Sequence, residues 1–432
     1  MNDHFDVFII GTGTSATTVA YECSAAGLNV GIADYQPFGG TCALRGCDPK
    51  KILVGVAESV DWCRRMNGKG VISDAVKIDW KKLIEFKQSM ITPHTHYLEE
   101  SFRKNGIKSF SGYVRFLNRN LLSIENTSFE ADHIVIASGA CPQNLAIPGK
   151  ELVITSDQFL NLTELPSPII FIGGGYISYE FAHIAARCGS GGYILHRGEQ
   201  PLNKFDPDLV SLLIKKTESL GFQTVTSCEV IGVIKEGNAF VVQGQTLDGE
   251  VNFKGHLVVH GAGRVPAIEG LDLSKAGVDF SRHGITVNSF LQSISNPAVY
   301  AAGDAATKSA PPLTPTARYD GMIVAQNILY GNSVETKYEN IPSVVFTIPP
   351  MASLGFTETE AIQRGYHIKK TFQDISSWYF NRRIGEDTSV FKLITDENSK
   401  QILGVHYLGP LAEEVINIFT IALQNNLPQN EL

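Results

Sequence analysis

The feature that most constrains the fold is a pattern of strand, glycine turn and helix that occurs twice. In the first copy, the apolar residues 5–10 lead into Gly11-Thr-Gly13-Thr-Ser-Ala16 and then into a helical stretch. In the second copy, residues 169–172 lead into Gly173-Gly-Gly175. Glycines at these positions permit a tight turn and allow a pyrophosphate to approach the N-terminus of a helix. An α/β fold with two dinucleotide-binding units is therefore predicted.

The two copies differ in the residues that follow their second strands. Asp34 ends the first of these strands, and an acidic side chain there can bond ribose hydroxyls. In the second copy, the strand ends in His196-Arg197 with no acidic residue at residues 192–197, and Lys204 is nearby. Basic side chains could hold a 2′-phosphate, so NADPH is favoured over NADH. The alternative is a solvated basic turn.

Two cysteines lie in the segment Gly39-Gly-Thr-Cys42-Ala-Leu-Arg-Gly-Cys47-Asp-Pro-Lys50-Lys51. In a regular helix, their Cα atoms would be roughly 8–9 Å apart, which is too far for a disulfide without strain. The glycines therefore predict a bend, and Asp48-Pro49 predicts an N-cap followed by the first helical position. Cys47 would lie at a helix start with Lys50 and Lys51 nearby, which favours a thiolate.

A redox-active pair is the interpretation that these residues favour. Two structural cysteines are one alternative, and a zinc site is another. Zinc normally takes four ligands, and the sequence has no second cluster of cysteines and histidines at a suitable spacing. The pair His94-x-His96 is expected to be a surface feature, so no metal site is predicted.

The motif Gly-Gly-Thr-Cys-x4-Cys-x-Pro-Lys and the two glycine turns resemble the class I pyridine nucleotide-disulfide oxidoreductases. This flavoprotein family includes glutathione reductase, lipoamide dehydrogenase and mercuric reductase. The resemblance runs from about residue 5 to about residue 427. It implies that the first unit binds FAD and the second binds the nicotinamide cofactor. It also implies that Cys42 exchanges with the substrate and that Cys47 is the charge-transfer thiol.

The resemblance implies roles for further residues. Lys50 and Glu180 would pair beside the flavin, as catalytic residues with Cys42 and Cys47, and Tyr176 would cover the flavin until the nicotinamide arrives. Asp304 would bond the ribityl chain. The residues expected to contact a cofactor are Gly11, Gly13, Ala16, Asp34, Gly40, Thr41, Lys50, Ser138, Gly139, Gly173, Gly175, Tyr176, Arg197, Lys204, Gly263, Arg264, Gly303, Asp304, Leu313, Thr314 and Pro315.

The motifs also divide the chain into domains. Residues 1–150 and 276–338 are predicted to form an FAD-binding domain, with an NAD(P)H-binding domain at 151–275 between its two parts. Both would be Rossmann-like. Residues 339–432 resemble the α+β interface domain of the family, which implies a homodimer.

The charge and the cysteine content of the chain argue against some binding partners and locations. A net charge of −8 shows no basic excess for nucleic acid or an anionic membrane. Seven cysteines in 432 residues do not make a secreted disulfide scaffold, and the apolar start is too short to span a bilayer. A cytoplasmic enzyme is therefore expected.

The chain departs from the family pattern in several places. The family ends in a segment with a histidine and a glutamate that act as an acid-base dyad, whereas this chain has no histidine after His406, which is expected to be structural. The expectation is that the chain is truncated or that its chemistry differs. Tyr21 stands where glutathione reductases generally carry an arginine, and Ala43-Leu44-Arg45 replaces the usual Val-Asn-Val.

The function predicted from the sequence is electron transfer from NADPH through FAD to the Cys42–Cys47 disulfide and then to a small disulfide substrate. Two alternatives stay open. One is a flavin reductase for quinones, oxygen or metals, in which the dithiol is secondary. The other is a catalytically idle flavoprotein that acts as a redox-responsive binding module.

Overall fold

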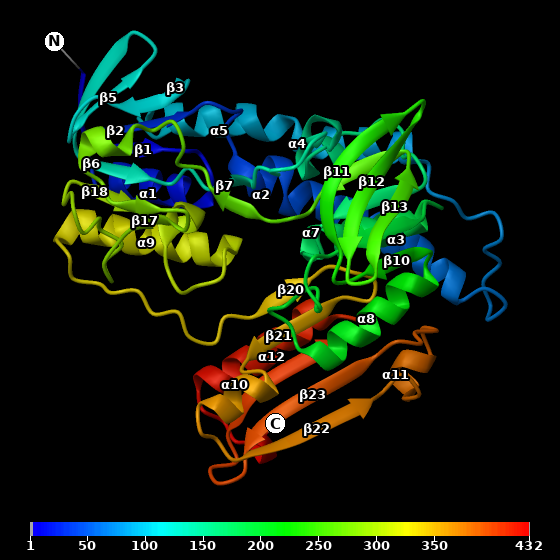
Figure 1. The fold of residues 1–432 in the computed structure, drawn as a ribbon. Coiled ribbons are helices and arrows are strands. Elements are labelled where there is room, and N and C mark those ends of the chain that lie inside the picture. Colours follow the sequence, from blue (N-terminus) through cyan, green and yellow to red (C-terminus); the bar gives the residue numbers. More distant parts are fainter. Residues whose placement is uncertain (1–2, 432) are drawn as a thin grey trace. The chain divides into compact units, whose positions relative to one another are not determined.

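The computed structural model describes residues 3–431, which belong to two compact, sequence-interleaved units (Figure 1). The first unit comprises residues up to Pro49, Lys87–Gln143 and Arg264–Tyr338. The second comprises Lys50–Phe86, Asn144–Gly263 and the residues from Glu339 onward. The division into four domain segments stays a prediction.

The first unit is built on a largely parallel sheet. Its strands lie in the order β3-β2-β1-β6-β5-β4, and β18 also pairs with β6. Strands β1, β2, β3, β6 and β18 run parallel, whereas β4, β5 and β6 are joined as antiparallel hairpins. The bounds are β1 (Asp3–Ile10), β2 (Val30–Asp34), β3 (Lys108–Ser111), β4 (Val114–Phe116), β5 (Leu121–Ile124), β6 (Thr127–Ile136) and β18 (Val299–Ala301).

Both faces of this sheet are covered, because Phe5 and Phe8 pack into one apolar cluster and Val7 and Ile9 into another. Helices α1 and α9 pack against each other, and Gly321 permits this contact, since a Cβ there would lie 2.7 Å from the Ser15 carbonyl oxygen. The other elements of this unit are α1 (Thr14–Ala25), α2 (Gly40–Arg45), α5 (Pro93–Lys104), α9 (Thr314–Tyr330), β7 (Ala140–Pro142), β15 (Arg264–Pro266), β16 (Phe280–Ser281), β17 (Gly284–Thr286), β19 (Ala306–Thr307), η2 (Leu273–Ala276) and η3 (Gly303–Ala305).

The second unit contains a second parallel sheet, in the order β10-β9-β8-β14, and an antiparallel sheet, β11-β12-β13. Every residue of β8 and of β14 is buried, as expected for a sheet covered on both faces. The elements are β8 (Ile169–Ile172), β9 (Gly192–Leu195), β10 (Phe222–Val225), β11 (Glu229–Glu236), β12 (Ala239–Thr246), β13 (Gly249–Gly255), β14 (Leu257–His260), η1 (Lys150–Leu152), α6 (Ser156–Phe159), α7 (Tyr176–Arg187) and α8 (Pro207–Ser219). Helices α3 (Cys47–Arg65) and α4 (Trp80–Ile91) lie mainly in this unit.

The C-terminal part of the second unit is an antiparallel sheet, β20-β21-β24-β23-β22, against which α12 packs (Figure 1). His406 is buried in this sheet, between the Ser353 hydroxyl and the Phe356 carbonyl. The predicted structural role of His406 is therefore confirmed. The elements are β20 (Ser343–Val345), β21 (Met351–Gly355), α10 (Glu358–Gln363), β22 (Ile368–Asp374), α11 (Tyr379–Arg382), β23 (Val390–Asp396), β24 (Ile402–Leu408), α12 (Ala412–Gln424) and η4 (Gln429–Glu431).

The predicted fold class is confirmed: the chain has two Rossmann-like parallel sheets and a C-terminal α+β part. One local prediction was wrong. Helix α3 begins at Cys47, so Asp48 lies inside the first turn and does not cap it. An acidic side chain there still faces the positive end of the helix dipole. Among the residues that the structure describes, no helix is long and apolar enough to cross a membrane.

The start of β9 offers a test of the second sheet. Gly192 has φ 152°, and a Cβ there would lie 1.8 Å from the Ile169 carbonyl oxygen, whereas Gly189 has φ 89° and open space around it. Gly189→Ala should cost about 1 kcal/mol of unfolding free energy through backbone strain alone. Gly192→Ala should cost about 2–4 kcal/mol, because overpacking adds to the strain. Urea unfolding of both variants measures the difference, and equal costs would contradict the packing argument.

Candidate active site

The first glycine turn is held by Asp34. The backbone N–H and the hydroxyl of Thr12 donate to the same Asp34 carboxylate oxygen, at 2.9 and 2.7 Å. Gln36 donates its N–H to the other oxygen at 3.0 Å. The Thr12 hydroxyl accepts from the Gly39 N–H at 3.2 Å. Asp34 thus fixes the turn and the start of the cysteine-bearing segment together.

Two backbone segments, the glycine turn and the start of α2, are in close contact. Gly40 has φ 71°, and a Cβ there would lie 2.4 Å from the Cα of Gly13. A Cβ on Gly11 would lie 2.3 Å from the Ala137 carbonyl oxygen. Because Gly40 and Gly13 have no side chains, the start of α2, two residues before Cys42, can contact the glycine turn directly.

The residues around this turn fit an anionic dinucleotide such as FAD. Helix α1 has Gly13 as its N-cap, no side-chain cap and no acidic residue in its first turn. Its first N–H groups are therefore suited to phosphate. In the described part of the chain, the buried hydroxyls of Ser15, Ser138 and Thr316 have no hydrogen-bond partner. Ala16 is fully buried in the core, so its small side chain serves packing.

The two cysteines lie on either side of a helix break. Helix α2 ends at Arg45, Gly46 has φ −142° and ψ −106°, and α3 begins at Cys47. The predicted bend is confirmed. Both cysteines are of intermediate exposure. A hydrogen bond with Cys47 raises the pKa of the Cys42 thiol, burial raises this pKa further, and the charge of Asp48 adds to the effect. These effects outweigh a hydrogen bond with Thr314, which lowers the same pKa, so the protonated form of Cys42 is favoured.

A second helix N-terminus lies beside Cys47. Helix α9 begins at Thr314, and the Thr314 hydroxyl oxygen lies 3.6 Å from the Cys47 sulfur. Helix α9 has no side-chain cap and no acidic residue in its first turn. Cys47 is therefore close to the positive end of α9 as well as at the start of α3, and both favour negative charge on its sulfur. The sequence had assigned Thr314 to the cofactor and gave no sign of this contact.

The turn at Gly303-Asp304 depends on an aspartate that the sequence analysis missed. Asp320, in α9, is fully buried and accepts from the Gly303 N–H at 2.9 Å and from the Tyr338 hydroxyl at 2.7 Å. It also pairs with Lys308. Burial raises the pKa of the neighbouring Asp304. An acidic residue in the interior of a helix carries no sequence signal for this role.

Arg264 and Gly139 lie where two segments of the first unit are joined by hydrogen bonds. The Arg264 guanidinium donates to the Ala140 carbonyl at 2.6 Å, and the Ala267 N–H donates to the Gly139 carbonyl at 2.9 Å. Strands β7 and β15, which contain Ala140 and Arg264, pair antiparallel at the same place. Both residues therefore join two crossing segments of the first unit.

The predicted pair of Lys50 and Glu180 forms in the second unit. The Lys50 Nζ atom lies 2.8 Å from a Glu180 carboxylate oxygen, and both side chains are buried. The same oxygen accepts from the Phe346 N–H at 2.9 Å, and Lys50 lies 4.2 Å from the centre of the Phe346 ring. Phe346 was not predicted, because no motif links it to either residue.

The second glycine turn is held by a histidine. The Gly174 N–H donates to Nδ1 of His196 at 3.3 Å, and Nε2 of His196 contacts the Gln200 carbonyl at 3.0 Å. Burial lowers the pKa of His196, so the ring is neutral at pH 7 and is already engaged. A contact of His196 with a 2′-phosphate stays a prediction, and positive charge at this turn comes from Arg197 and Lys204.

The other predicted nucleotide contacts of the second unit lie around this turn. A Cβ on Gly173, which has φ 107°, would lie 2.4 Å from the Gly261 carbonyl oxygen. Gly175 is the N-cap of α7, which has no side-chain cap and no acidic residue in its first turn. Tyr176 is half exposed. Gly263, Arg197 and Lys204 are exposed.

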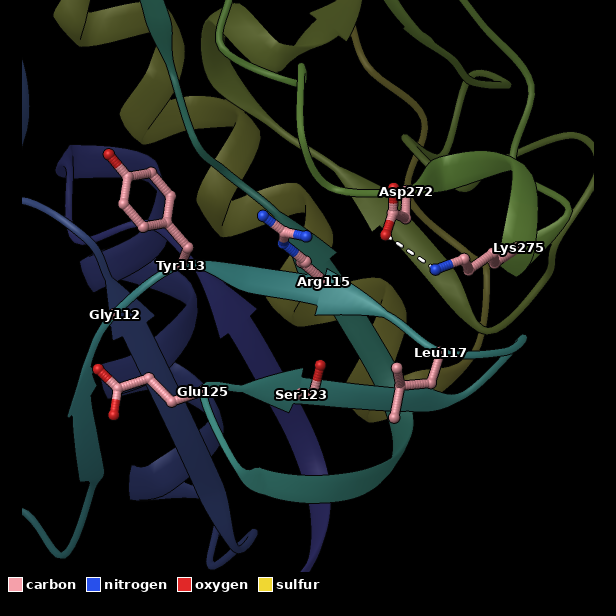
Figure 2. A pocket seen from close by; sticks show the side chains of 8 residues that line it. All are labelled: Gly112, Tyr113, Arg115, Leu117, Ser123, Glu125, Asp272 and Lys275. Atoms are coloured by element: carbon pink, nitrogen blue, oxygen red, sulfur yellow. Dashed lines mark hydrogen bonds and ion pairs between the residues drawn. The ribbon is translucent and has the colours of Figure 1, made fainter.

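Two cavities in the described part of the chain are lined mostly by residues other than the predicted site residues. Figure 2 shows one of about 460 Å³, lined by residues of β4, β5 and η2, with Arg115 between Tyr113 and the Asp272–Lys275 ion pair. No predicted site residue lines it. A second cavity of about 590 Å³ is lined partly by Leu44 and Arg45, which lie between the two cysteines.

These features define a class of protein. Two glycine turns on parallel sheets, each followed by an uncapped helix, are suited to two dinucleotides, and a pair of half-buried thiols lies beside the first turn. This combination is typical of a dinucleotide-dependent dithiol oxidoreductase.

Comparison with known proteins identifies the family. The profile of the pyridine nucleotide-disulphide oxidoreductases matches residues 5–321, and the profile of their dimerisation domain matches residues 341–432. The chain belongs to this family, whose members are FAD-dependent enzymes that use NAD(P)H. The match to the dimerisation domain supports self-association.

Individual relatives carry different names. The chain is 31% identical to glutathione reductase from Burkholderia cepacia, over 97% of this chain and 92% of the relative. It is 30% identical to dihydrolipoyl dehydrogenase from Chlamydia muridarum, over 99% and 92%. A solved structure of the flavoprotein disulfide reductase RclA from Escherichia coli, described as HOCl-induced and as a Cu(II) complex, matches with TM-score 0.87 and 26% identity over 100% and 95%.

The contact between Thr314 and Cys47 leads to a prediction. Thr314→Val removes a hydroxyl that stabilises the Cys47 thiolate, so less thiolate should be present at neutral pH. The rate of alkylation of Cys47 in the reduced protein should fall about 2- to 10-fold, as expected for one lost hydrogen bond. Mass spectrometry of the Cys47 peptide measures this rate. Thr420→Val, in α12, removes a hydroxyl that donates to the Ile416 carbonyl; it is the matched control and should leave the rate unchanged. Equal rates in both variants would contradict the assignment.

Proposed function

We propose that this chain is an NADPH:disulfide oxidoreductase that acts on a small disulfide. The observation that carries the proposal is the asymmetry of the thiol pair. Cys47 lies at the N-terminus of α3, 3.6 Å from the Thr314 hydroxyl at the start of α9, whereas Cys42 lies within α2 and its thiol has a raised pKa. A protonated outer thiol beside a stabilised thiolate suits an exchange reaction followed by resolution.

The dithiol chemistry is assigned as follows. Cys42 passes its proton to the Cys47 sulfur and, as a thiolate, attacks one sulfur of the substrate disulfide. The substrate S–S bond breaks, and the departing sulfur takes that proton from Cys47 and leaves as a thiol. The Cys47 thiolate restored in this way attacks Cys42 in the mixed disulfide, which forms the Cys42–Cys47 disulfide and releases the second substrate sulfur as a thiolate that takes a proton from solvent. Bound FAD would supply the two electrons, taken from the nicotinamide, that return this disulfide to the dithiol.

The groups that would hold the cofactors follow from the two turns. Gly11, Gly13 and the buried hydroxyls near them would face the FAD pyrophosphate, and Asp304 the ribityl chain. The Lys50–Glu180 pair is assigned to the flavin ring, where the ammonium would be held in a fixed position. In the second unit, Gly173 and Gly175 would face the nicotinamide dinucleotide, with Tyr176 at the start of α7.

The remaining assignments concern assembly and location. The dimerisation-domain match supports a homodimer. Beyond Cys42 and Cys47, the chain has five dispersed cysteines, a usage that suits a reducing compartment such as the cytoplasm.

The thiol roles are tested by anaerobic titration with NADPH. The wild-type protein and Cys42→Ser should both develop a long-wavelength absorption band from a thiolate beside the flavin, and Cys47→Ser should not. Cys42→Ser should lose disulfide turnover by on the order of 10³-fold or more, since it lacks the attacking sulfur. A flavin that simply bleaches in the wild type, or unaffected disulfide turnover in Cys42→Ser, would end the assignment.

The choice of NADPH is tested at Arg197. This exposed residue follows β9, a strand that does not end in an acidic side chain able to bind a ribose diol. Arg197→Ala should raise the KM for NADPH about 10- to 100-fold by removing charge-assisted hydrogen bonds to a 2′-phosphate, and should leave the KM for NADH nearly unchanged. Arg282→Ala, at another exposed arginine, is the control. Equal use of both cofactors by the wild type would refute the preference.

A second candidate is a flavin reductase in which the dithiol is secondary. The RclA structure that matches this chain is described as a Cu(II) complex, which favours testing a metal acceptor beside quinones. Turnover of a quinone or Cu(II) that survives in Cys42→Ser would support this candidate, whereas its loss would favour the disulfide assignment.

A further inference from the structure

Helix α7 carries a buried polar stripe, formed by Glu180, His183 and Arg187. Their spacing places all three on one face of the helix. Each is at most 2% exposed. Buried polar groups require hydrogen-bond or charged partners, so the residues around the stripe must supply them.

The stripe binds the backbone of residues 346–348. Glu180 accepts from the Phe346 N–H at 2.9 Å, and Nδ1 of His183 accepts from the Ile348 N–H at 3.0 Å. The Arg187 guanidinium donates to the Ile348 carbonyl at 2.9 Å. This short segment lies within the region that matches the dimerisation domain, so that domain supplies partners for all three charged or polar groups of the stripe.

The stripe also binds α3 at two points. Glu180 pairs with Lys50, and Arg187 donates to Asp61 at 2.8 Å. Helix α3, helix α7 and residues 346–348 therefore form one buried network, and Lys50 lies at its end nearest to Cys47 along α3.

The Phe346 ring closes this end of the network. The ammonium of Lys50 lies 4.2 Å from the ring centre, and that of Lys51 lies 4.5 Å from it. Lys50 is buried, whereas Lys51 is exposed. The face of an aromatic ring attracts a cation, and the attraction is stronger where the cation has lost water. Phe346 therefore contacts the Lys50–Glu180 pair twice, with its backbone N–H and with its ring.

We propose that Phe346 is a positioning residue that fixes the Lys50 ammonium for electron transfer, so that the dimerisation domain completes the redox site of its own chain. The inference rests on the proposed function, because it assigns Lys50 to the flavin. Phe346 acts through Lys50 and Glu180 and needs no contact with substrate.

The experiment compares Phe346→Leu with the wild-type holoenzyme by two measurements. The first is the rate at which an amine-reactive acylating reagent labels Lys50, relative to the exposed Lys51, read by peptide mass spectrometry. The second is the rate of anaerobic flavin reduction by NADPH in stopped flow. Without the ring, labelling of Lys50 should rise and flavin reduction should fall, each about 3- to 30-fold, as expected for the loss of a partly buried cation–π contact.

Matched variants separate this role from general packing. Phe346→Tyr keeps an aromatic face and should restore both rates to within about twofold. Phe356→Leu removes a ring that carries the Arg364 guanidinium at 4.3 Å in the same domain, and it should change neither rate. If Phe346→Leu fails to fold, 3,4,5-trifluorophenylalanine at position 346 keeps the shape, weakens the ring face and should still slow flavin reduction.

Unchanged labelling of Lys50 would overturn the proposal whatever reaction the enzyme catalyses. Unchanged flavin reduction, or no rescue by Phe346→Tyr, would also overturn it. The Cys42→Ser experiment is independent of both measurements, so the proposed function and the role of Phe346 can fail separately.

Discussion

The structure depends on one buried carboxylate, Glu180. A charge without a partner in a protein interior costs several kcal/mol, so Glu180 can be buried only when the Lys50 ammonium and the Phe346 N–H are both in place. Lys50 comes from α3 and Phe346 from the C-terminal part of the chain. Burial of this one group therefore requires that three separate segments dock correctly, and it links the helix that begins at Cys47 to the domain that matches the dimerisation profile.

The predicted nucleotide sites depend on glycines, which have no side chain, and not on a buried charge. Gly13 and Gly40 allow two backbone segments to touch, and Gly173 allows the second turn to approach Gly261. The helices that follow begin without side-chain caps, so their N–H groups stay suited to an anion. Elsewhere in the second unit, Thr155, Asp206 and Thr357 cap α6, α8 and α10. Helices α11 and α12 also begin without side-chain caps, so the combination of a glycine turn with an uncapped helix is what suits a ligand.

Residues within motifs could be predicted from the sequence, and residues that serve them from far away could not. The glycine turns, the helix break before Cys47 and the pair of Lys50 with Glu180 were all anticipated, because each lies in a pattern of fixed spacing. Asp320 and Phe346 were missed. Asp320 accepts a hydrogen bond from the backbone N–H of Gly303, and Phe346 donates its backbone N–H to the carboxylate of Glu180. Contacts between positions that are distant in sequence leave no periodicity or composition signal. The hydrogen bonds of His196 to Gly174 and Gln200 were likewise not predicted, because its partial burial cannot be read from its neighbours.

The break at Gly46 has a mechanical consequence. Helix α2 has only 6 residues, whereas α3 has 19 and is anchored by buried ion pairs at Lys50 and Asp61. A change in the distance between the two sulfur atoms can therefore be taken up by rotation about the backbone of Gly46, where neither helix continues.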